Sequence, residues 1–570
     1  MRLLISFFIV LTAVLAVAGL AKWAFWPSRD LPVHRVRHTR IRLRLRLHPG
    51  PGFASAFECW LRWGRLASLR GSKRARPSLP FWRRLIRPAE HSVLVGRAHY
   101  RLRLRVPVQE SITITAPPRA GKTGMLADLV LHFCGPVVAT SVKSDIYELT
   151  SGIRAQRGPI AVFNPQHVSD LPSTFAWSPV AGCADPEVAA RRAEAFTGAI
   201  SVKGTEHEDF WAQQASEFFR AALMAADLAG GDMRLVGRWL MGSAEDAEAI
   251  LERAGQDQWA TSLAQLRSPA ERTISTIRLL HNKALSFLGN PALAAAVLPG
   301  PGTAFDIEGF LAACGTLYLI AEAQTEEAPV APLMACFLNE VHYTAKLAGS
   351  RMPGRRLDPP LLLALDEIAN IAPVNIPGFM ADAGGRGIQM AIVSHGLGQL
   401  RDRWGEHGAQ IISDTAGCKI FLPGITDTAL LKAASELCGQ AAFREKGRQR
   451  FIYGQAAVRD QGRERFSRHD VCDVAMLREL PDGWALLVRG GRAPVLAKLP
   501  RAWAGRAYKR ARRHGRAVYQ APAPAVVPVS HEFTLTPAAA PAAGPGGTGH
   551  KAGGNGHRDA AGFPWGGEDQ

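Results

Sequence analysis

Residues 116–123 have the composition of a phosphate-binding loop. They spell A-P-P-R-A-G-K-T, with Ala116 in place of the usual first glycine, and they follow the β-branched run SITIT at 111–115. A helical pattern of apolar residues comes next, so the order strand, loop, Gly-Lys-Thr, helix is the one that such a loop requires. In this setting Lys122 neutralises the β- and γ-phosphates, the Thr123 hydroxyl binds Mg²⁺, and backbone N–H groups hold the β-phosphate. The predicted nucleotide-binding residues are Pro118, Arg119, Ala120, Gly121, Lys122, Thr123 and Gly124.

A second segment supplies the carboxylates that this chemistry needs. Residues 360–370 read P-L-L-L-A-L-D-E-I-A-N, an aliphatic run that ends in Asp366 and Glu367. Such a run is typical of a strand buried on both faces of a parallel sheet. At its carboxyl end Asp366 is placed to orient Mg²⁺ through water, and Glu367 to polarise the attacking water as a general base. The loop and the acidic pair together predict ATP hydrolysis, with ATP and Mg²⁺ as the cofactors.

Two further residues are candidate catalytic groups. The expected strand 388–394 ends at His395, and in sheets of this kind the tip of the strand beside the Asp-Glu strand senses the γ-phosphate. An ordinary polar strand end is the alternative. Arg386 lies in the run G-G-R-G at 384–387, which we expect to be a flexible loop. Arg386 is therefore a candidate arginine finger toward a neighbouring subunit, and a solvated loop arginine is the alternative.

The elements that position these residues are spread along the chain. Lys122 and Asp366 are 244 residues apart, far more than a minimal nucleotide-binding fold needs. Apolar residues between about 181 and 300 recur at helical spacing, which predicts a helical insertion. Strands are expected to resume at 316–321, at the Asp-Glu segment, and at 388–394, 419–422 and 484–488.

The start of the chain has the pattern of a membrane anchor. Residues 3–21 carry no charge and would form a helix about 28 Å long, close to the thickness of the hydrocarbon core. One positive charge precedes this segment and many follow it, which predicts a single pass of the inner (plasma) membrane with the bulk of the chain in the cytoplasm. A cleaved signal peptide is the alternative, because AVAGLA resembles a cleavage site, but a strongly positive mature start opposes export.

The positive charge is concentrated near that anchor. The net charge is +19, and between Lys22 and Val108 there are 21 Lys and Arg residues against three acids. Residues 40–47, R-I-R-L-R-L-R-L, alternate with period two, and 101–106 repeat the pattern. We expect strands with arginines on one face, lying against anionic membrane lipids. A strip that tracks the phosphates of nucleic acid is the alternative.

The spacing of the cysteines and histidines predicts no zinc site. The eight cysteines are widely spaced, which fits reduced and mostly buried thiols. The run E-H-E-D at 206–209 is similar to a metal-binding cluster, but acids at a helix N-terminus are favoured by the helix dipole. We therefore interpret this run as a helix start.

The order of motifs from residue 110 to about 500 resembles the TraG/VirD family of type IV secretion coupling proteins. The loop keeps a family arginine at Arg119, and Lys143 follows the next expected strand. The chain departs from the family pattern at Ser141 and His395, where the family commonly has aspartate and glutamine. The other similar motifs are FNP at 163–165, WSPV at 177–180, EDFW at 208–211, DEIAN at 366–370, GRGI at 385–388, HGLGQL at 395–400 and SELCG at 435–439.

The resemblance implies a hexameric ATPase of bacterial conjugation. Its cargo would be single-stranded DNA with an attached relaxase, delivered to the components of a type IV secretion channel, and the chain would form a homo-hexamer. The fold class expected is α/β: a RecA-like P-loop NTPase core with an inserted all-α domain, an N-terminal transmembrane helix and a disordered C-terminal tail. Two other functions stay open, a double-stranded DNA translocase of the FtsK type and a non-hydrolysing membrane receptor that docks secreted substrates.

The domain boundaries follow from these patterns. The tail from residue 521 is rich in Ala, Pro and Gly and has too little apolar content to order itself. We expect a transmembrane helix at 1–26, a basic membrane-proximal segment at 27–109, the nucleotide-binding domain at 110–180 and 301–500, the all-α domain at 181–300, and a basic segment with the tail at 501–570.

Overall fold

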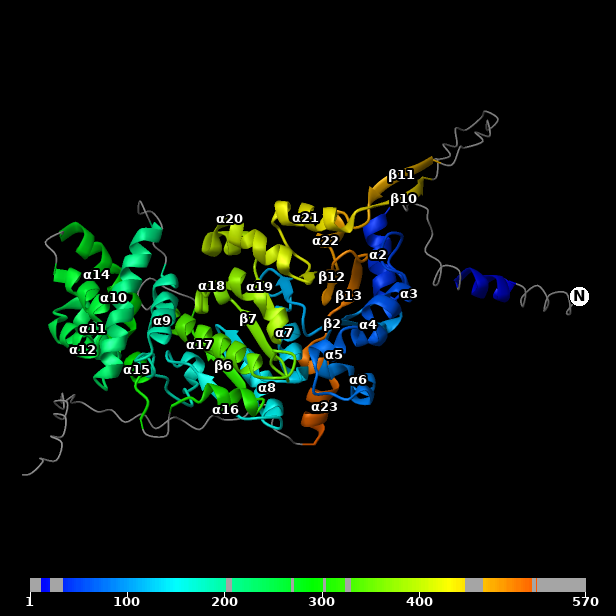
Figure 1. The fold of residues 1–570 in the computed structure, drawn as a ribbon. Helices are drawn as coiled ribbons and strands as arrows, with labels where there is room; N and C mark the ends of the chain where they lie inside the picture. The colour runs from blue at the N-terminus through cyan, green and yellow to red at the C-terminus, as the bar shows by residue number, and fades with distance from the viewer. Residues whose placement is uncertain are drawn as a thin grey trace, which may run out of the picture. The chain divides into compact units, whose positions relative to one another are not determined.

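An eleven-stranded sheet forms the centre of the fold (Figure 1). The computed structural model describes residues 12–20, 34–200, 208–267, 271–300, 304–322, 330–445, 465–514 and 519 of the 570-residue chain. The strand order is β2-β1-β13-β12-β9-β3-β8-β7-β4-β6-β5. The strands are β1 (Ser92–Arg97), β2 (Arg103–Pro107), β3 (Ile112–Thr115), β4 (Val137–Ser141), β5 (Ile160–Phe163), β6 (Thr316–Ile320), β7 (Leu361–Asp366), β8 (Ile388–Ser394), β9 (Cys418–Phe421), β12 (Trp484–Val488) and β13 (Val495–Lys498).

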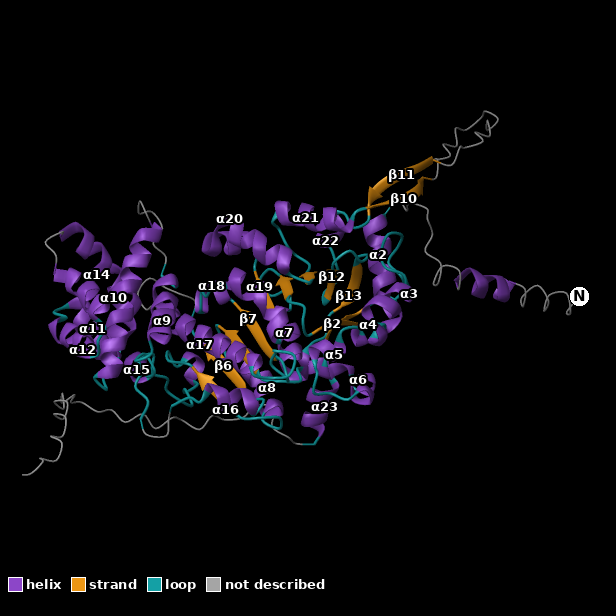
Figure 2. Ribbon diagram, in the orientation of Figure 1, coloured by secondary structure: helices purple, strands orange, loops and turns teal. Residues whose placement is uncertain are grey.

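The half of the sheet from β9 to β5 is parallel, and the four strands beyond β9 are antiparallel. In the parallel half, successive residues of β7 point to opposite faces and both faces are buried, as the continuous aliphatic run predicted. Leu361, Leu363 and Leu365 pack in one core cluster, and Leu362 and Ala364 in another. The predicted mixed α/β fold with a large parallel sheet is therefore confirmed (Figure 2).

Helices cover the two faces of this parallel half. The first face is packed by α7 (Lys122–His132) and α8 (Asp145–Arg154). The opposite face is packed by α17 (Ala331–Ser350), α18 (Ile368–Ile371), α19 (Ile376–Arg386) and α20 (Leu397–Thr415). Each of these helices lies in the chain between two strands of the parallel half, the arrangement that parallel pairing requires.

A run of helices lies between β5 and β6 in the chain. Within it, Ala215, Phe218, Phe219 and Ala222 are buried at helical spacing on one face of α10 (Glu208–Leu228). The run comprises α9 (Pro186–Gly198), α10, α11 (Met233–Met241), α12 (Glu245–Arg253), α13 (Asp257–Ala264), η5 (Gln265–Arg267), α14 (Glu271–Leu285), η6 (Ser286–Gly289), α15 (Pro291–Ala295) and α16 (Ile307–Ala312). A short turn, η4 (Val168–Asp170), precedes it.

The first alternating basic segment is a helix, so the strand predicted at 40–47 is wrong. Helix α2 (Arg35–Arg44) buries Thr39, Arg42 and Leu43, which share one helical face. Arginine and leucine are good helix formers, and packing of that face decides the conformation over the period-two pattern. The second alternating segment does form a strand, β2. The remaining N-terminal elements are α3 (Ala56–Glu58), η1 (Cys59–Trp63), α4 (Arg65–Leu69), α5 (Ser72–Ala75), α6 (Phe81–Ile86), η2 (Pro88–Glu90) and η3 (His99–Arg101).

The segment after β13 packs against the phosphate-loop helix. Ala502 of η7 (Ala502–Ala504) contacts Ala127 and Leu131 of α7, and the basic helix α23 (Arg506–Arg513) follows. Before β12 lie α21 (Thr428–Cys438), the hairpin β10 (Gln440–Glu445) and β11 (Arg465–Asp470), and α22 (Val474–Arg478).

Three of the sequence predictions fall largely outside the described residues. Of the apolar segment 3–21 only 12–20 are described, and these are helical and exposed. Among the helices that the structure describes, none has the length and apolar character needed to cross a membrane. The side chains of 206–209 and the tail from 521 lie outside the described part. All eight cysteines are free and six are buried.

Candidate nucleotide-binding site

The loop between β3 and α7 has the backbone of an anion-binding turn. Gly121 adopts φ 95°, a left-handed conformation that glycine reaches without strain, and α7 begins at the next residue, Lys122. The first turn of α7 contains no acidic residue, and no side chain caps it. Its backbone N–H groups and the positive end of the helix dipole are therefore available to an anion. Pro118 and Arg119 are exposed, whereas Ala120, Gly121 and Thr123 are half-buried.

Strand register brings the loop and the acidic pair to one edge of the sheet. Thr115 of β3 lies opposite Ser394 of β8, and Asp366 of β7 lies opposite Val393 of β8. The carboxyl ends of β3, β8 and β7 are thus neighbours, and β8 lies directly beside the Asp-Glu strand. His395, the candidate γ-phosphate sensor, directly follows the end of β8.

Four of the predicted residues meet at this edge. The Lys122 Nζ atom lies 2.9 Å from Glu367 Oε1 and 3.8 Å from Asp366 Oδ1. His395 Nε2 lies 2.5 Å from the same Glu367 oxygen and 3.3 Å from Lys122 Nζ. Glu367 itself holds a left-handed backbone with φ 52°, uncommon for a residue other than glycine and frequent at functional sites. Lys122, Asp366, Glu367 and His395 therefore form one cluster.

Two amides complete the cluster, and sequence analysis assigned no role to them. Gln399 Nε2 donates to Glu367 Oε2 at 3.3 Å, and Gln399 Oε1 accepts from the His395 backbone N–H at 3.1 Å. Asn370 Nδ2 also donates to Glu367 Oε2, at 3.4 Å. Both amides lie inside motifs that resemble the coupling-protein family, DEIAN and HGLGQL, which is the signal that identifies them. They fix the orientation of the Glu367 carboxylate.

The two carboxylates have different electrostatic environments. Burial raises the pKa of Asp366 to about 6, and the Lys122 ammonium offsets only part of that effect. Burial acts on Glu367 too, but a hydrogen bond and the charge of Lys122 outweigh it, so the pKa of Glu367 lies below its usual value. The side-chain oxygen Asp366 Oδ1 is buried and has no hydrogen-bond partner among the described residues. The backbone carbonyl of Asp366 accepts a separate hydrogen bond from Thr140 Oγ1 at 2.7 Å. An unsatisfied buried carboxylate oxygen is a suitable ligand for Mg²⁺ or its bound water, so Asp366 fits the predicted magnesium site.

Arg386 lies outside this cluster. The expected flexible loop at 384–387 is wrong, because residues 384–386 form the last turn of α19, and only Gly387, with φ 81°, ends the helix. Arg386 Nε lies 3.1 Å from Asp382 Oδ1 at the amino end of β8, the opposite end of that strand from His395. A Cβ atom on Gly384 would lie 2.4 Å from the Gln109 carbonyl oxygen, so close packing explains this glycine.

Comparisons with known proteins found a matching family model and similar solved structures. Residues 360–482 match the family model described as the TraM recognition site of TraD and TraG. The fold is similar to the bacterial conjugative coupling protein TrwBdeltaN70, with a TM-score of 0.52, 17% sequence identity and coverage of 71% of this chain and 88% of that chain. No curated protein sequence matches the chain.

Two further TrwB structures were obtained with bound nucleotides. The complex of TrwB with ADP and Mg²⁺ is 17% identical, covers 70% of this chain and 87% of its own, and has a TM-score of 0.50. The complex of TrwB with a non-hydrolysable ATP analogue, ADPNP, is also 17% identical with a TM-score of 0.50, over 69% of this chain and 86% of that chain. The chain therefore contains a segment similar to the TraM recognition site of TraD and TraG, and its fold is similar to that of a conjugative coupling protein, which confirms its resemblance to the TraG/VirD-type coupling proteins.

Proposed function

We propose that the chain is a membrane-anchored ATPase that couples ATP hydrolysis to the transfer of single-stranded DNA, with its relaxase, to a type IV secretion channel. The observation that carries the ATPase assignment is the contact between Lys122 and the Asp366–Glu367 pair, at 3.8 and 2.9 Å, across 244 residues of sequence. The carboxyl edge of a parallel sheet is where open α/β folds bind their ligands. The nucleotide-bound TrwB complexes support ATP and Mg²⁺ as the cofactors of this chain.

In the proposed mechanism each residue of the cluster has a separate task. Bound Mg²⁺ supplies charge that offsets the phosphates, and Thr123 and Asp366 would hold it. Lys122 leaves Glu367 and contacts the nucleotide phosphates, and the backbone N–H groups of residues 119–123 bind the same phosphates. Glu367, released from Lys122 and oriented by Gln399 and Asn370, accepts the proton of the attacking water. His395 contacts the γ-phosphate or that water.

The assembly and location in the proposal rest on the sequence. A homo-hexamer would place each nucleotide between subunits, with Arg386 of a neighbour as the proposed arginine finger. The apolar segment 3–21 would anchor the chain in the inner membrane, with the bulk of the chain in the cytoplasm. The basic residues near the anchor would face anionic lipids.

Phosphate release by the full chain in neutral detergent tests the proposal. We expect a single-stranded oligonucleotide to stimulate ATP turnover. High salt should remove this stimulation, because contacts with DNA phosphates weaken with salt. Lys122→Ala should abolish turnover. Arg253→Ala, on the exposed surface of α12, is the matched control and should leave turnover unchanged.

The other outcomes of this assay separate the alternatives. Stimulation by double-stranded DNA alone would favour a translocase of the FtsK type. The absence of turnover in the wild-type chain would favour the non-hydrolysing receptor. Turnover that survives Lys122→Ala would show that the active site lies elsewhere.

A further inference from the structure

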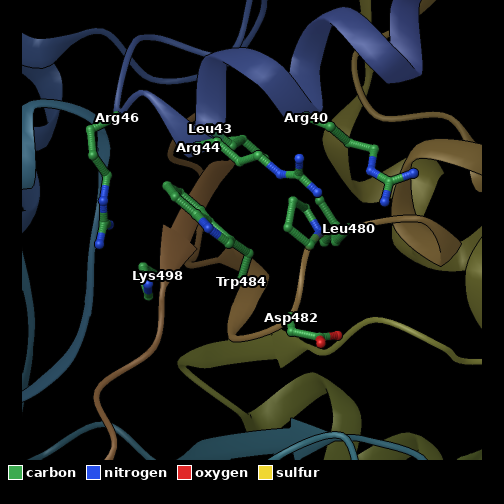
Figure 3. A pocket seen from close by; sticks show the side chains of 9 residues that line it. Arg40, Leu43, Arg44, Arg46, Leu480, Asp482, Trp484 and Lys498 are labelled. Atoms are coloured by element: carbon green, nitrogen blue, oxygen red, sulfur yellow. The ribbon is translucent and has the colours of Figure 1, made fainter. Parts of the chain in front are cut away.

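A polar hollow lies between α2 and the end of the antiparallel strands (Figure 3). Its volume is about 400 Å³, and Leu43 and Trp484 form part of its wall. Four cationic side chains and one acid line it. They are Arg40, Arg44, Arg46, Lys498 and Asp482. No residue of this hollow belongs to the nucleotide site.

The positive charges of the hollow are poorly compensated. Arg40 lies 3.7 Å from Glu479 Oε2, but among the described residues Arg44, Arg46 and Lys498 form no ion pair. Partial burial lowers the pKa of the mostly exposed Lys498, and the nearby charges of Arg46 and Arg501 lower it further. Like charges that outnumber the nearby acids destabilise the folded chain, so an anion that joins them would be bound favourably.

Arg46 is held in place and has an unused donor. Its guanidinium lies over the Trp484 ring at 5.0 Å from the centroid, and Trp484 is only 3% exposed. The Arg46 Nη1 atom is buried and has no hydrogen-bond partner among the described residues. A buried donor without an acceptor destabilises the folded chain, and a guanidinium fork matches the oxygens of a phosphate. A phosphate group bound beside Arg46 would supply an acceptor for this donor.

The surroundings of the hollow favour a lipid as the source of that phosphate. Ile41 and Leu45, next to Arg40 and Arg44 in the chain, are 43% and 57% exposed, so apolar and cationic side chains are adjacent at this end of α2. Helix α2 follows the apolar segment 3–21 after a short connection, which spans at most about 45 Å when extended. Trp484 is too deeply buried to stack on a nucleic-acid base.

We propose that the hollow lined by Arg40, Arg44, Arg46 and Lys498 binds the phosphate of an anionic phospholipid headgroup. Arg46 and Lys498 contact the phosphate oxygens, Asp482 accepts from headgroup hydroxyls, and Ile41 and Leu45 lie toward the acyl chains. This inference rests on the membrane anchoring in the proposed function, and it gives the N-terminal basic segment a specific ligand.

Titration of the full chain with a soluble lipid tests this inference. The chain is kept in neutral maltoside micelles, dioctanoyl-phosphatidylglycerol is added, and the shift of the unfolding midpoint gives the apparent Kd. We expect saturable stabilisation of the wild-type chain. Arg46→Ala and Lys498→Ala should each weaken binding about tenfold, and Arg46→Lys less, because an ammonium keeps the charge but loses the fork. Arg37→Ala, an exposed arginine of α2 outside the hollow, is the matched control and should stay within about twofold.

Several results would overturn the inference. Equal affinity of wild-type and hollow variants would exclude this site, and Lys498→Ala guards against misfolding because Lys498 is exposed. Equal binding of inorganic phosphate would indicate a free-anion site. If the hollow variants lost affinity for a single-stranded oligonucleotide but bound phosphatidylglycerol as the wild type does, the hollow would be assigned to nucleic acid. Lys122→Ala should leave the phosphatidylglycerol titration unchanged. If the wild-type chain hydrolyses ATP but does not bind phosphatidylglycerol in the hollow, this inference alone is refuted.

Discussion

The Lys122 ammonium lies 2.9 Å from Glu367 Oε1, and both side chains are mostly buried. In this state the loop lysine is neutralised by the proposed general base. In the proposed mechanism, nucleotide phosphates compete with Glu367 for Lys122, so nucleotide binding would both position the substrate and release the base. This single contact would then link nucleotide binding to hydrolysis.

His395 is expected to contribute to hydrolysis more than to binding. It contacts both Glu367 and Lys122 in the cluster, at 2.5 and 3.3 Å. His395→Ala should lower kcat by about 10–100-fold, because a sensing or proton-transfer group acts in the transition state, and should change the ATP Kd by less than about threefold. His395→Gln, which restores the residue common in the family, should recover part of the rate. A variant with wild-type kcat would remove His395 from the catalytic set.

Gly124 provides the space for Trp503 beside the phosphate loop. A Cβ atom on Gly124 would lie 2.6 Å from the Trp503 ring. Gly124→Ala should therefore lower the free energy of unfolding by about 1–3 kcal/mol through overpacking. In the double variant with Trp503→Ala, Gly124→Ala should cost little. Full additivity of the two changes in denaturant titrations would show that the contact does not form in solution.

Glu340 joins the inserted helices to the sheet layer. It lies on α17, and its Oε1 atom is 3.1 Å from Arg191 Nη2 and 3.4 Å from Arg192 Nη2, both on α9. Glu340→Ala would leave two largely buried guanidiniums without their carboxylate, so we expect a loss of about 3–5 kcal/mol in denaturant titrations. Glu308→Ala removes the exposed pair with Arg351 and should change stability by less than about 1 kcal/mol. Equal effects of the two variants would contradict this account.

His281 should make the helical region sensitive to acid. Burial against α10 lowers the pKa of His281 to about 4, and the charge of Arg278 acts in the same direction. The hydrogen bond from His281 Nε2 to the Ala215 carbonyl, at 2.9 Å, favours the protonated form but offsets only part of this effect. The unfolded chain binds the proton from about pH 6.5 downward, whereas the folded chain does so only near pH 4, so stability falls as the pH drops through this window.

The expected loss from His281 between pH 7 and pH 5 is roughly 2 kcal/mol. His281→Gln should reduce the difference between the unfolding midpoints at these two pH values, while the exposed control His407→Gln should not. The same pH dependence in wild type and His281→Gln would contradict the assignment.

The sequence predicted the parallel core well because its signals are local and strong. The aliphatic residues before Asp366 and those at 388–394 predict buried strands, and Gly-Lys-Thr marks the start of α7. Alternation was misleading at 40–47, because burial of Thr39, Arg42 and Leu43 against distant segments decided for a helix. Long-range packing of that kind has no local sequence signal.

The cluster itself was only partly accessible from the sequence. Lys122, Asp366, Glu367 and His395 belong to motifs whose strand context indicates their position. The hydrogen bonds of Gln399 and Asn370 to Glu367 depend on side-chain geometry that no motif specifies. The glycines around Arg386 favour a loop in the sequence, yet Gly384 lies within α19 and packs closely against the Gln109 backbone, and Gly387 ends that helix.

Single-turnover phosphate release from Glu367→Gln tests the central claim most directly, that Lys122 and Glu367 act on one nucleotide. Loss of the charge that holds Lys122 should leave ATP binding as tight as in wild type or tighter. The release of phosphate from bound ATP should slow by at least about 100-fold, because the base is absent. Release at the wild-type rate, or loss of ATP binding in this variant, would contradict the account.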